Sequence, residues 1–312
     1  MPKHTFVNND SEKIRLDIFL TYNLDLSRNK TSFLILNDLV KVNKKLVNKN
    51  NFVLKVGDVV ELEYDESIFN KVSNEILPFN KKLDIVYEDD DLIIVNKETN
   101  MLSHPTTHNE PDTLLNCLMY HNNKQKVYLA HRLDKDTTGL IVATKNFKAL
   151  EKIQEQITKR TMKRYYLAIV HYPFNELRAV IDAPIGYLKD HDLKFGVENT
   201  KNPKNAITKI YVLDQNKKYA LIKCELLTGR THQIRVHMDF IKHNIVNDPL
   251  YGVKGEQRTD YKQFLHAYQL ELTHPTTNVP LFFEVKPDEV FMKKLFDVHL
   301  DLNQELKGLF DN

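Results

Sequence analysis

Apolar patterns of two kinds follow one another irregularly along this chain, and this irregular order constrains the fold more than any other feature. Apolar stretches typical of strands occur at 83–87, 92–95, 164–170, 206–213 and 219–227. Helical spacing appears at Leu150, Ile153 and Ile157, and again from Asp288 onward. No strand–helix–strand unit repeats at a fixed period. The sequence therefore predicts an α+β protein with a mixed, largely antiparallel central sheet.

Composition divides the 312 residues into two parts joined by a polar segment. Residues 12–65 combine two short helical patterns with short strands at 40–43 and 59–64, which predicts a small α+β module. Residues 66–80 are rich in Ser, Asn and Pro with few apolar side chains, which predicts a linker. Residues 81–312 then form the larger second domain.

Composition also limits the compartment and the partners. No run of about 18 apolar residues is present, and the N-terminal segment lacks the apolar core of a signal peptide, so we expect a cytoplasmic protein with no membrane partner. The two cysteines, Cys117 and Cys224, lack paired spacing, so buried free thiols are expected rather than a disulfide or a zinc site. A formal net charge of +2 does not by itself indicate nucleic acid. Cations do gather near the N-terminus and over 145–164, either to neutralise phosphates or as a solvated surface.

A charged turn between two apolar stretches is the first candidate site. It runs from His131 to Gly139, between the apolar residues 127–129 and 140–143. A turn of this kind carries function in some proteins and is a surface loop with local hydrogen bonds in others. Both interpretations remain open from the residues alone.

The second candidate segment spans residues 227–237. Gly229 permits a sharp turn from strand to helix, and Thr231 is the expected helix cap. Arg230 at this helix start is suited to pair with a carboxylate. His232 and His237 fall on different sides of the predicted helix, so a metal site is not expected there.

The third candidate is an aromatic residue in the strand 164–170. Alternation places Tyr166 on the face opposite Leu167 and Ile169, with the small Ala168 beside it. A tyrosine in this position either stacks on a nucleic-acid base or fills the core.

Together these segments resemble the RluA/RluD-type family of ribosomal large-subunit pseudouridine synthases. The family string His-Arg-Leu-Asp, two variable residues, Thr-Ser-Gly appears here as residues 131–139, with Thr138 in place of serine. Further family motifs appear in the same order at 226–237, 247–252, 265–267 and 274–275, with Asn247 in place of glycine. Residues 15–62 resemble the alpha-L RNA-binding module, which such enzymes often carry at the N-terminus.

The resemblance implies an isomerase that converts specific uridines to pseudouridine in structured RNA by base flipping. Asp134 would be the catalytic carboxylate, Tyr166 the stacking aromatic and Arg230 the ion-pair partner of Asp134. Arg132 would fill the gap that the flipped nucleotide leaves. The other residues expected to bind RNA are His131, Thr138, Arg15, Arg28, Lys30, Lys41 and Arg235.

The resemblance also implies partners and cofactors. The expected substrate is large-subunit (23S) ribosomal RNA or its precursor particle, and the expected state is a monomer. No cofactor or metal is expected, because the net reaction is an isomerisation.

Two other functions compete with this interpretation. Asp134, Asp136 and Thr138 match the Asp-x-Asp-x-Thr pattern of haloacid-dehalogenase-type phosphatases, although that chemistry needs an apolar strand running directly into the first aspartate. A requirement for magnesium, tested with a chelator, separates the two enzymes. The other alternative is a non-catalytic RNA-binding protein on the same scaffold.

Overall fold

The computed structural model describes residues 2–9, 14–24, 26, 28–65, 68–69, 76–106, 110–189, 194–256 and 259–302, without the side chains of Arg28 and Asn29. The chain divides into two compact units, Met1–Glu75 and Ile76–Asn312. This division falls within the predicted linker 66–80, of which residues 66, 67 and 70–75 lie outside the described residues. The domain boundaries at 65 and 81 remain predictions.

The smaller unit packs two helices against short strands around a core of its own. Its helices are α1 (Leu16–Leu24) and α2 (Arg28–Leu36). Its strands are β1 (Lys3–Val7), β2 (Ile14–Arg15), β3 (Val40–Val42), β4 (Lys45–Leu46), β5 (Val53–Leu54) and β6 (Val59–Glu63). The order β1-β6-β3-β4 forms one antiparallel sheet, and β2 pairs with β5. On β3 the two valines are buried and Lys41 points outward, as strand alternation requires.

The larger unit is built on one ten-stranded sheet with the order β12-β16-β17-β11-β18-β10-β8-β7, to which β19 and β9 add on β18 and β10. These strands are β7 (Ile85–Glu88), β8 (Leu92–Lys97), β9 (Tyr128–Leu129), β10 (Thr138–Thr144), β11 (Lys163–His171), β12 (Arg178–Asp182), β16 (Ile207–Gln215), β17 (Tyr219–Leu226), β18 (Leu265–Thr273) and β19 (Pro280–Glu284). A small separate sheet contains β13 (Ile185–Leu188), β14 (Phe195–Gly196) and β15 (Thr200–Lys204).

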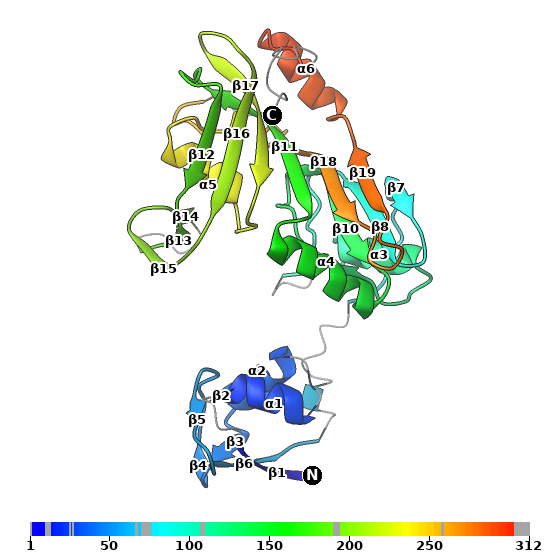
Figure 1. Cartoon of the computed structure of the whole chain (residues 1–312), viewed down its shortest axis with the longest axis vertical. Helices are drawn as coiled ribbons and strands as arrows, with labels where there is room; N and C mark the ends of the chain where they lie inside the picture. The colour runs from blue at the N-terminus through cyan, green and yellow to red at the C-terminus, as the bar shows by residue number, and fades with distance from the viewer. Residues whose placement is uncertain are drawn as a thin grey trace. The chain divides into compact units, whose positions relative to one another are not determined.

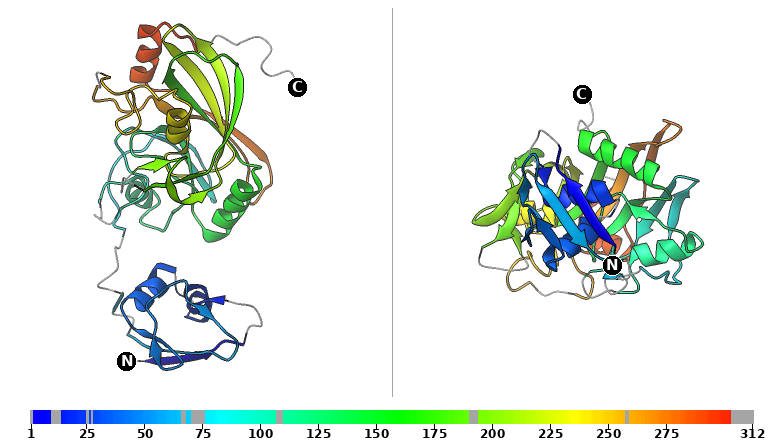
Figure 2. Two further views of the ribbon diagram at one scale, coloured as in Figure 1. Left: turned by 90° about the vertical axis from the view of Figure 1, so that its left-hand side faces the viewer. Right: turned by 90° about the horizontal axis from the view of Figure 1, so that it is seen from below.

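Strand direction confirms the predicted fold class. The strands of the large sheet follow one another as one twisted layer (Figure 2). Within the described residues, β10 and β18 run parallel and the other named strand pairs run antiparallel. The protein is therefore α+β with a mixed, largely antiparallel sheet.

Helices cover both faces of this sheet (Figure 1). They are α3 (Leu114–His121), α4 (Phe147–Lys159), α5 (Gln233–Phe240) and α6 (Glu289–Asp297). One face carries α3 and α5 over a core that includes Tyr166 and Ala168 of β11. The alternate residues of β11, Leu167 and Ile169, lie on the other face with α6, and α4 packs farther along that face over β8, β10 and β18. The face of β11 predicted for Tyr166 is thus confirmed.

Two further sequence expectations can be compared with these elements. Cys117 and Cys224 are buried free thiols, as predicted. None of the helices in the described ranges combines the length and apolarity needed to cross a bilayer.

Candidate active site

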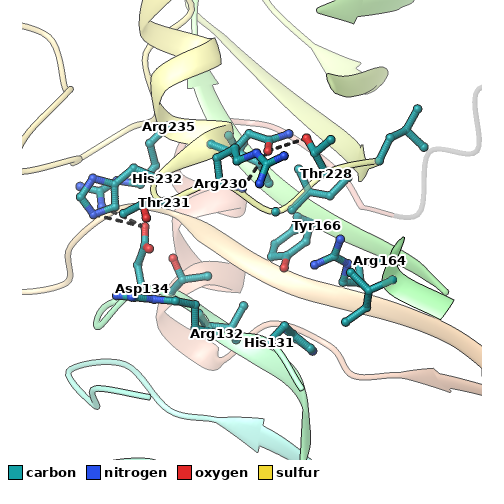
Figure 3. A pocket seen from close by; sticks show the side chains of 18 of the residues that line it. His131, Arg132, Asp134, Arg164, Tyr166, Thr228, Arg230, Thr231, His232 and Arg235 are labelled. Carbon is teal, nitrogen blue, oxygen red and sulfur yellow. Dashed lines mark hydrogen bonds and ion pairs between the residues drawn. The ribbon is translucent and has the colours of Figure 1, made fainter. Parts of the chain in front are cut away.

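A pocket of about 460 Å³ in the larger unit collects most of the predicted site residues (Figure 3). Its walls come from the loop before β10, from the start of β11 and from the turn between β17 and α5. Lining residues that the sequence singled out are His131, Arg132, Asp134, Tyr166, Arg230 and Arg235. This volume lies within the range of small-molecule binding sites, so the pocket is large enough to hold a single everted nucleoside.

The loop that carries Asp134 is anchored on both sides of this residue. On one side, the Ser103 hydroxyl donates to the carbonyl oxygen of Leu133 at 2.7 Å and accepts from the Leu133 amide at 3.1 Å. On the other side, Lys97 Nζ donates to the carbonyl oxygen of Lys135 at 3.0 Å, and the Met101 amide donates to the same oxygen at 3.1 Å. The backbone next to the predicted catalytic carboxylate is therefore held from a neighbouring segment.

Lys97 makes this anchor from inside the protein. It is 1% exposed, and Nζ also donates to the carbonyl oxygens of Glu98 and Met101, each at 2.9 Å. Burial lowers the pKa of Lys97 to about 7, against the opposing charges of Asp136 and Asp134. The three carbonyl acceptors match the three N–H bonds of an ammonium group. Lys97 thus satisfies three carbonyl acceptors around the loop.

Gly139 fixes the far end of the loop, where β10 begins beside β18. Its φ is +103°, and a Cβ at this position would lie 2.2 Å from the carbonyl oxygen of Ala267. Any side chain would displace β10 from its parallel partner. Glycine is required here both for the conformation and for the close approach.

An ion-pair chain holds Asp134 in the pocket. Arg235 Nη1 lies 3.0 Å from Asp134 Oδ2, while Arg235 Nε and Nη2 bind the two carboxylate oxygens of Asp248 at 2.6 and 2.9 Å. Burial alone would raise the pKa of Asp248, but the hydrogen bonds and charge of Arg235 outweigh it and lower that pKa. Arg235 is therefore pinned by Asp248 and presents its remaining N–H group to Asp134.

The predicted ion pair between Arg230 and Asp134 is wrong. Arg230 is exposed, and its Nε donates to the carbonyl oxygen of Asn205 at 2.8 Å. Arg235 instead lies in the first turn of α5, on its buried face, and is 5% exposed. Helical side chains lean toward the N-terminus of their helix, so the Arg235 guanidinium reaches back toward the loop. Arg235, expected to bind RNA, is thus the ion-pair partner of Asp134.

The cap of α5 also differs from the prediction. His232, not Thr231, is the N-cap, with φ of 56°. Gln233 organises this turn, because its Oε1 accepts from the Arg230 amide at 3.0 Å and from the Thr228 hydroxyl at 2.8 Å. His232 Nε2 comes within 4.0 Å of Asp134 Oδ2, and burial lowers the pKa of His232 despite that carboxylate. At neutral pH His232 is therefore uncharged beside Asp134.

Tyr166 forms the wall of the pocket opposite Asp134 (Figure 3). It is 5% exposed, and burial together with the charge of Asp134 raises the pKa of its phenol. The ring is therefore neutral and largely covered by the core. The part of the ring that faces the pocket is open to a base. Stacking of a base on Tyr166 remains a prediction.

The remaining residues predicted to bind RNA fall in several places. Arg132 is exposed at the pocket. Thr138 is 4% exposed, and its hydroxyl lies 2.8 Å from His266 Nδ1, so the predicted contact of Thr138 with RNA is replaced by one inside the core. In the smaller unit, Arg15 forms an ion pair with Asp17 at 2.8 Å. Lys30 and Lys41 are exposed, and Lys30 Nζ lies 4.9 Å from the centroid of the Phe69 ring. The side chain of Arg28 lies outside the described residues.

Fold and site together describe an enzyme with one oriented carboxylate in a cation-lined pocket, and comparison with known proteins specifies the family. Residues 91–240 match the RNA pseudouridylate synthase family, and residues 14–60 match the S4 domain. An uncharacterised RNA pseudouridine synthase of Mycoplasma pneumoniae is 48% identical over 297 residues, covering 95% of this chain and 96% of that protein. An uncharacterised RNA pseudouridine synthase of Bacillus subtilis, YlyB, is 37% identical over 280 residues, covering 86% and 89%.

Comparison with solved structures supports the same family. Human RNA pseudouridylate synthase domain containing 1 superposes with a TM-score of 0.56 at 27% identity, covering 68% of this chain and 86% of that one. The chain belongs to the RNA pseudouridine synthase family: it is an isomerase that modifies RNA and carries an S4 RNA-binding domain. This replaces both alternatives. The phosphatase interpretation also fails on geometry, since the preceding strand β9 ends at Leu129 and does not run directly into Asp134, while β10 follows the aspartate.

Proposed function

We propose that this RNA pseudouridine synthase isomerises specific uridines of large-subunit (23S) ribosomal RNA, free or in its precursor particle, with Asp134 as the catalytic carboxylate. The observation that carries the proposal is the position of Asp134, whose Oδ2 is 3.0 Å from Arg235 Nη1 at the wall of the pocket. Its side chain is 18% exposed, and Oδ1 has no protein partner among the described residues. One oxygen is thus oriented by Arg235 and the other is available to the substrate.

The reaction needs one such oxygen at the reacting uridine. The bond from N1 of uracil to C1′ of the ribose breaks, the base turns, and C5 bonds to C1′; a proton leaves C5 and N1 gains one. Substrate and product are isomers. Asp134 supplies the carboxylate that acts on the nucleotide, and the anchored loop keeps it in one geometry during the steps.

The uridine has to leave its helix or loop to reach Asp134, which costs a few kcal/mol. Two residues of the pocket are placed to offset this cost. Tyr166 offers an aromatic surface for the everted base, where stacking contributes about 1–3 kcal/mol. Arg132, exposed next to the loop, is available to occupy the vacated position in the RNA.

Two observations favour ribosomal RNA as the substrate. A protein of Nitrosomonas europaea named ribosomal large subunit pseudouridine synthase D is 40% identical over 220 residues, covering 67% of this chain and 63% of that protein. The S4 domain adds a second RNA-binding unit with exposed cations, which suits a large structured RNA.

The role of Asp134 is tested by the Asp134→Asn variant, which keeps the size of the side chain and removes its charge. We expect pseudouridine formation on large-subunit ribosomal RNA transcripts to fall below detection, while the dissociation constant for the same RNA stays close to that of the wild type. Substantial turnover by this variant would contradict the assignment.

The substrate is tested by mapping pseudouridine in total RNA from cells that lack this gene. We expect one or a few sites to be lost from large-subunit ribosomal RNA and restored by the wild-type gene but not by Asp134→Asn. Loss confined to transfer RNA would overturn the ribosomal assignment and leave the activity standing.

A further inference from the structure

A second arginine in the pocket has no partner among the described residues. Arg164, at the start of β11, is 6% exposed and lines the pocket. In the part of the chain that the structure describes, no ion pair or hydrogen bond reaches its guanidinium, and Nε is shielded from solvent without an acceptor. A buried cation without a counter-ion is unfavourable unless a ligand completes it.

His131 provides a second unsatisfied donor beside Arg164. Its Nε2 accepts from the Val142 amide at 3.2 Å, so Nδ1 carries the ring proton, and Nδ1 is enclosed with no acceptor at hydrogen-bonding geometry among the described residues. Burial and the neighbouring charge of Arg164 lower the pKa of His131 to about 3, against the opposing effect of the Arg132 backbone, so the ring stays neutral and remains a donor. Two adjacent donors that the described chain leaves unsatisfied indicate a site for an oxygen-bearing ligand.

The turn after β17 leaves room for this guanidinium. A Cβ on Gly229 would lie 3.1 Å from Arg164 Nη1, closer than ordinary contact. Arg164 and Asp134 lie on different sides of Tyr166 in the pocket (Figure 3). A ligand on Arg164 would therefore be held beside the stacking wall, away from the reacting carboxylate.

We propose that Arg164, with His131 as a second donor, binds a phosphate of the RNA backbone next to the everted uridine. An anion offsets the whole charge of the guanidinium, whereas a neutral uracil carbonyl does not, and the planar fork of arginine matches phosphate oxygens. The inference rests on the proposed function. It assigns Arg164 to substrate binding and leaves the chemical step to Asp134.

The test uses Arg164→Met, which removes the charge and keeps an apolar stem. Without RNA, the midpoint of thermal unfolding should rise, because an unpaired buried cation is removed. On large-subunit ribosomal RNA transcripts KM should rise about tenfold. In the Asp134→Asn background, the slope of log K against log salt should become less steep by about 1. The matched control is Lys293→Met on α6, an exposed lysine that does not line the pocket, which should change none of these values.

Each result decides the proposal. A lower unfolding midpoint with unchanged KM and salt slope would show that Arg164 is a structural cation and would overturn the proposal. A higher KM with an unchanged salt slope would also overturn it, because the ligand of Arg164 would then be a neutral acceptor and not a phosphate. If Arg164→Met fails to fold, Gly229→Ala replaces it as the test variant. The added methyl group would displace the Arg164 guanidinium and should raise KM. An unchanged KM would overturn the proposal. Wild-type enzyme on the same transcripts and on the precursor particle is the reference. Absence of pseudouridine in both would refute the proposed function, whereas pseudouridine in either provides the substrate on which the Arg164 variants are compared.

Discussion

Two arginines on one short segment, Arg230 and Arg235, have different surroundings in this protein. The position of Arg230 at a glycine turn where a helix begins favours a pair with a carboxylate, and the family resemblance names Asp134 as that carboxylate. The structure shows that the helix begins later, at Gln233, and turns Arg235 inward between Asp134 and Asp248. The residue types of the site were predictable from its motifs. Which arginine reaches the aspartate depends on the left-handed His232 and on Asp248, and local sequence does not reveal either.

The ion-pair chain predicts different effects for the two arginines. The Arg235 guanidinium binds Asp248 through two nitrogens and Asp134 through the third. In Arg235→Lys a single ammonium group cannot make all three contacts, so Asp134 loses its orientation. We expect kcat to fall about a hundredfold with a small change in KM. Arg230→Lys is the matched control and should leave kcat unchanged, since the carbonyl of Asn205 is its partner. Steady-state kinetics on one RNA transcript measures both, and the reverse ranking would restore Arg230 as the partner.

At the level of elements, apolar periodicity predicted the strands and helices around the site well. The strand 164–170 was expected, and β11 spans Lys163–His171 with Tyr166 on the predicted face. The anchoring of the loop that carries Asp134 was not predictable. Ser103 and Lys97 reach the loop from a segment 30 and 38 residues earlier, through hydrogen bonds that only the tertiary fold brings together. Periodicity reports which face is buried, but not which buried polar groups meet.

The junction of β10 and β18 predicts how stability depends on pH. His266 Nε2 lies 2.9 Å from the carbonyl oxygen of Val285, so Nε2 donates and Nδ1 accepts from the Thr138 hydroxyl. Burial lowers the pKa of His266 to about 4, against that carbonyl and the charge of Asp288. The unfolded chain, with a pKa near 6.5, binds more protons between pH 4 and 6.5. The stabilising contribution is therefore complete above about pH 6.5 and is lost as the pH falls toward 4.

Urea unfolding at pH 7.5 and pH 5 measures this dependence. Titration of His266 alone should lower the free energy of unfolding by about 2 kcal/mol over this interval. His131, whose pKa is also lowered, contributes in the same direction. The control His266→Gln removes one titrating group, so its loss of stability between the two pH values should be smaller than that of the wild type. Equal losses would show that His266 does not titrate in this range.

At the level of the whole molecule, the two units have separate hydrophobic cores. The core of the smaller unit is formed by residues up to Phe69, and the cores of the larger unit are formed by residues from Ile76 onward. All residues that line the candidate active-site pocket belong to the larger unit. Exposed lysines of the smaller unit lie on and near the hairpin of β3 and β4, at Lys41, Lys44, Lys45 and Lys49. We infer that the larger unit performs the reaction and the smaller one contributes affinity.

Removal of residues 1–75 separates these tasks. The remaining chain keeps its own cores and its complete pocket, so we expect it to fold and to retain kcat on ribosomal RNA transcripts. KM should rise, and the slope of log K against log salt should become less steep by about 0.9 for every RNA phosphate that the S4 domain had neutralised. Replacement of Lys41, Lys44, Lys45 and Lys49 by Gln in the full chain is the control and should reproduce the weaker salt dependence while the S4 domain stays folded. If kcat falls with the truncation, the smaller unit takes part in the chemical step; if the salt slope stays unchanged, RNA is bound without these lysines.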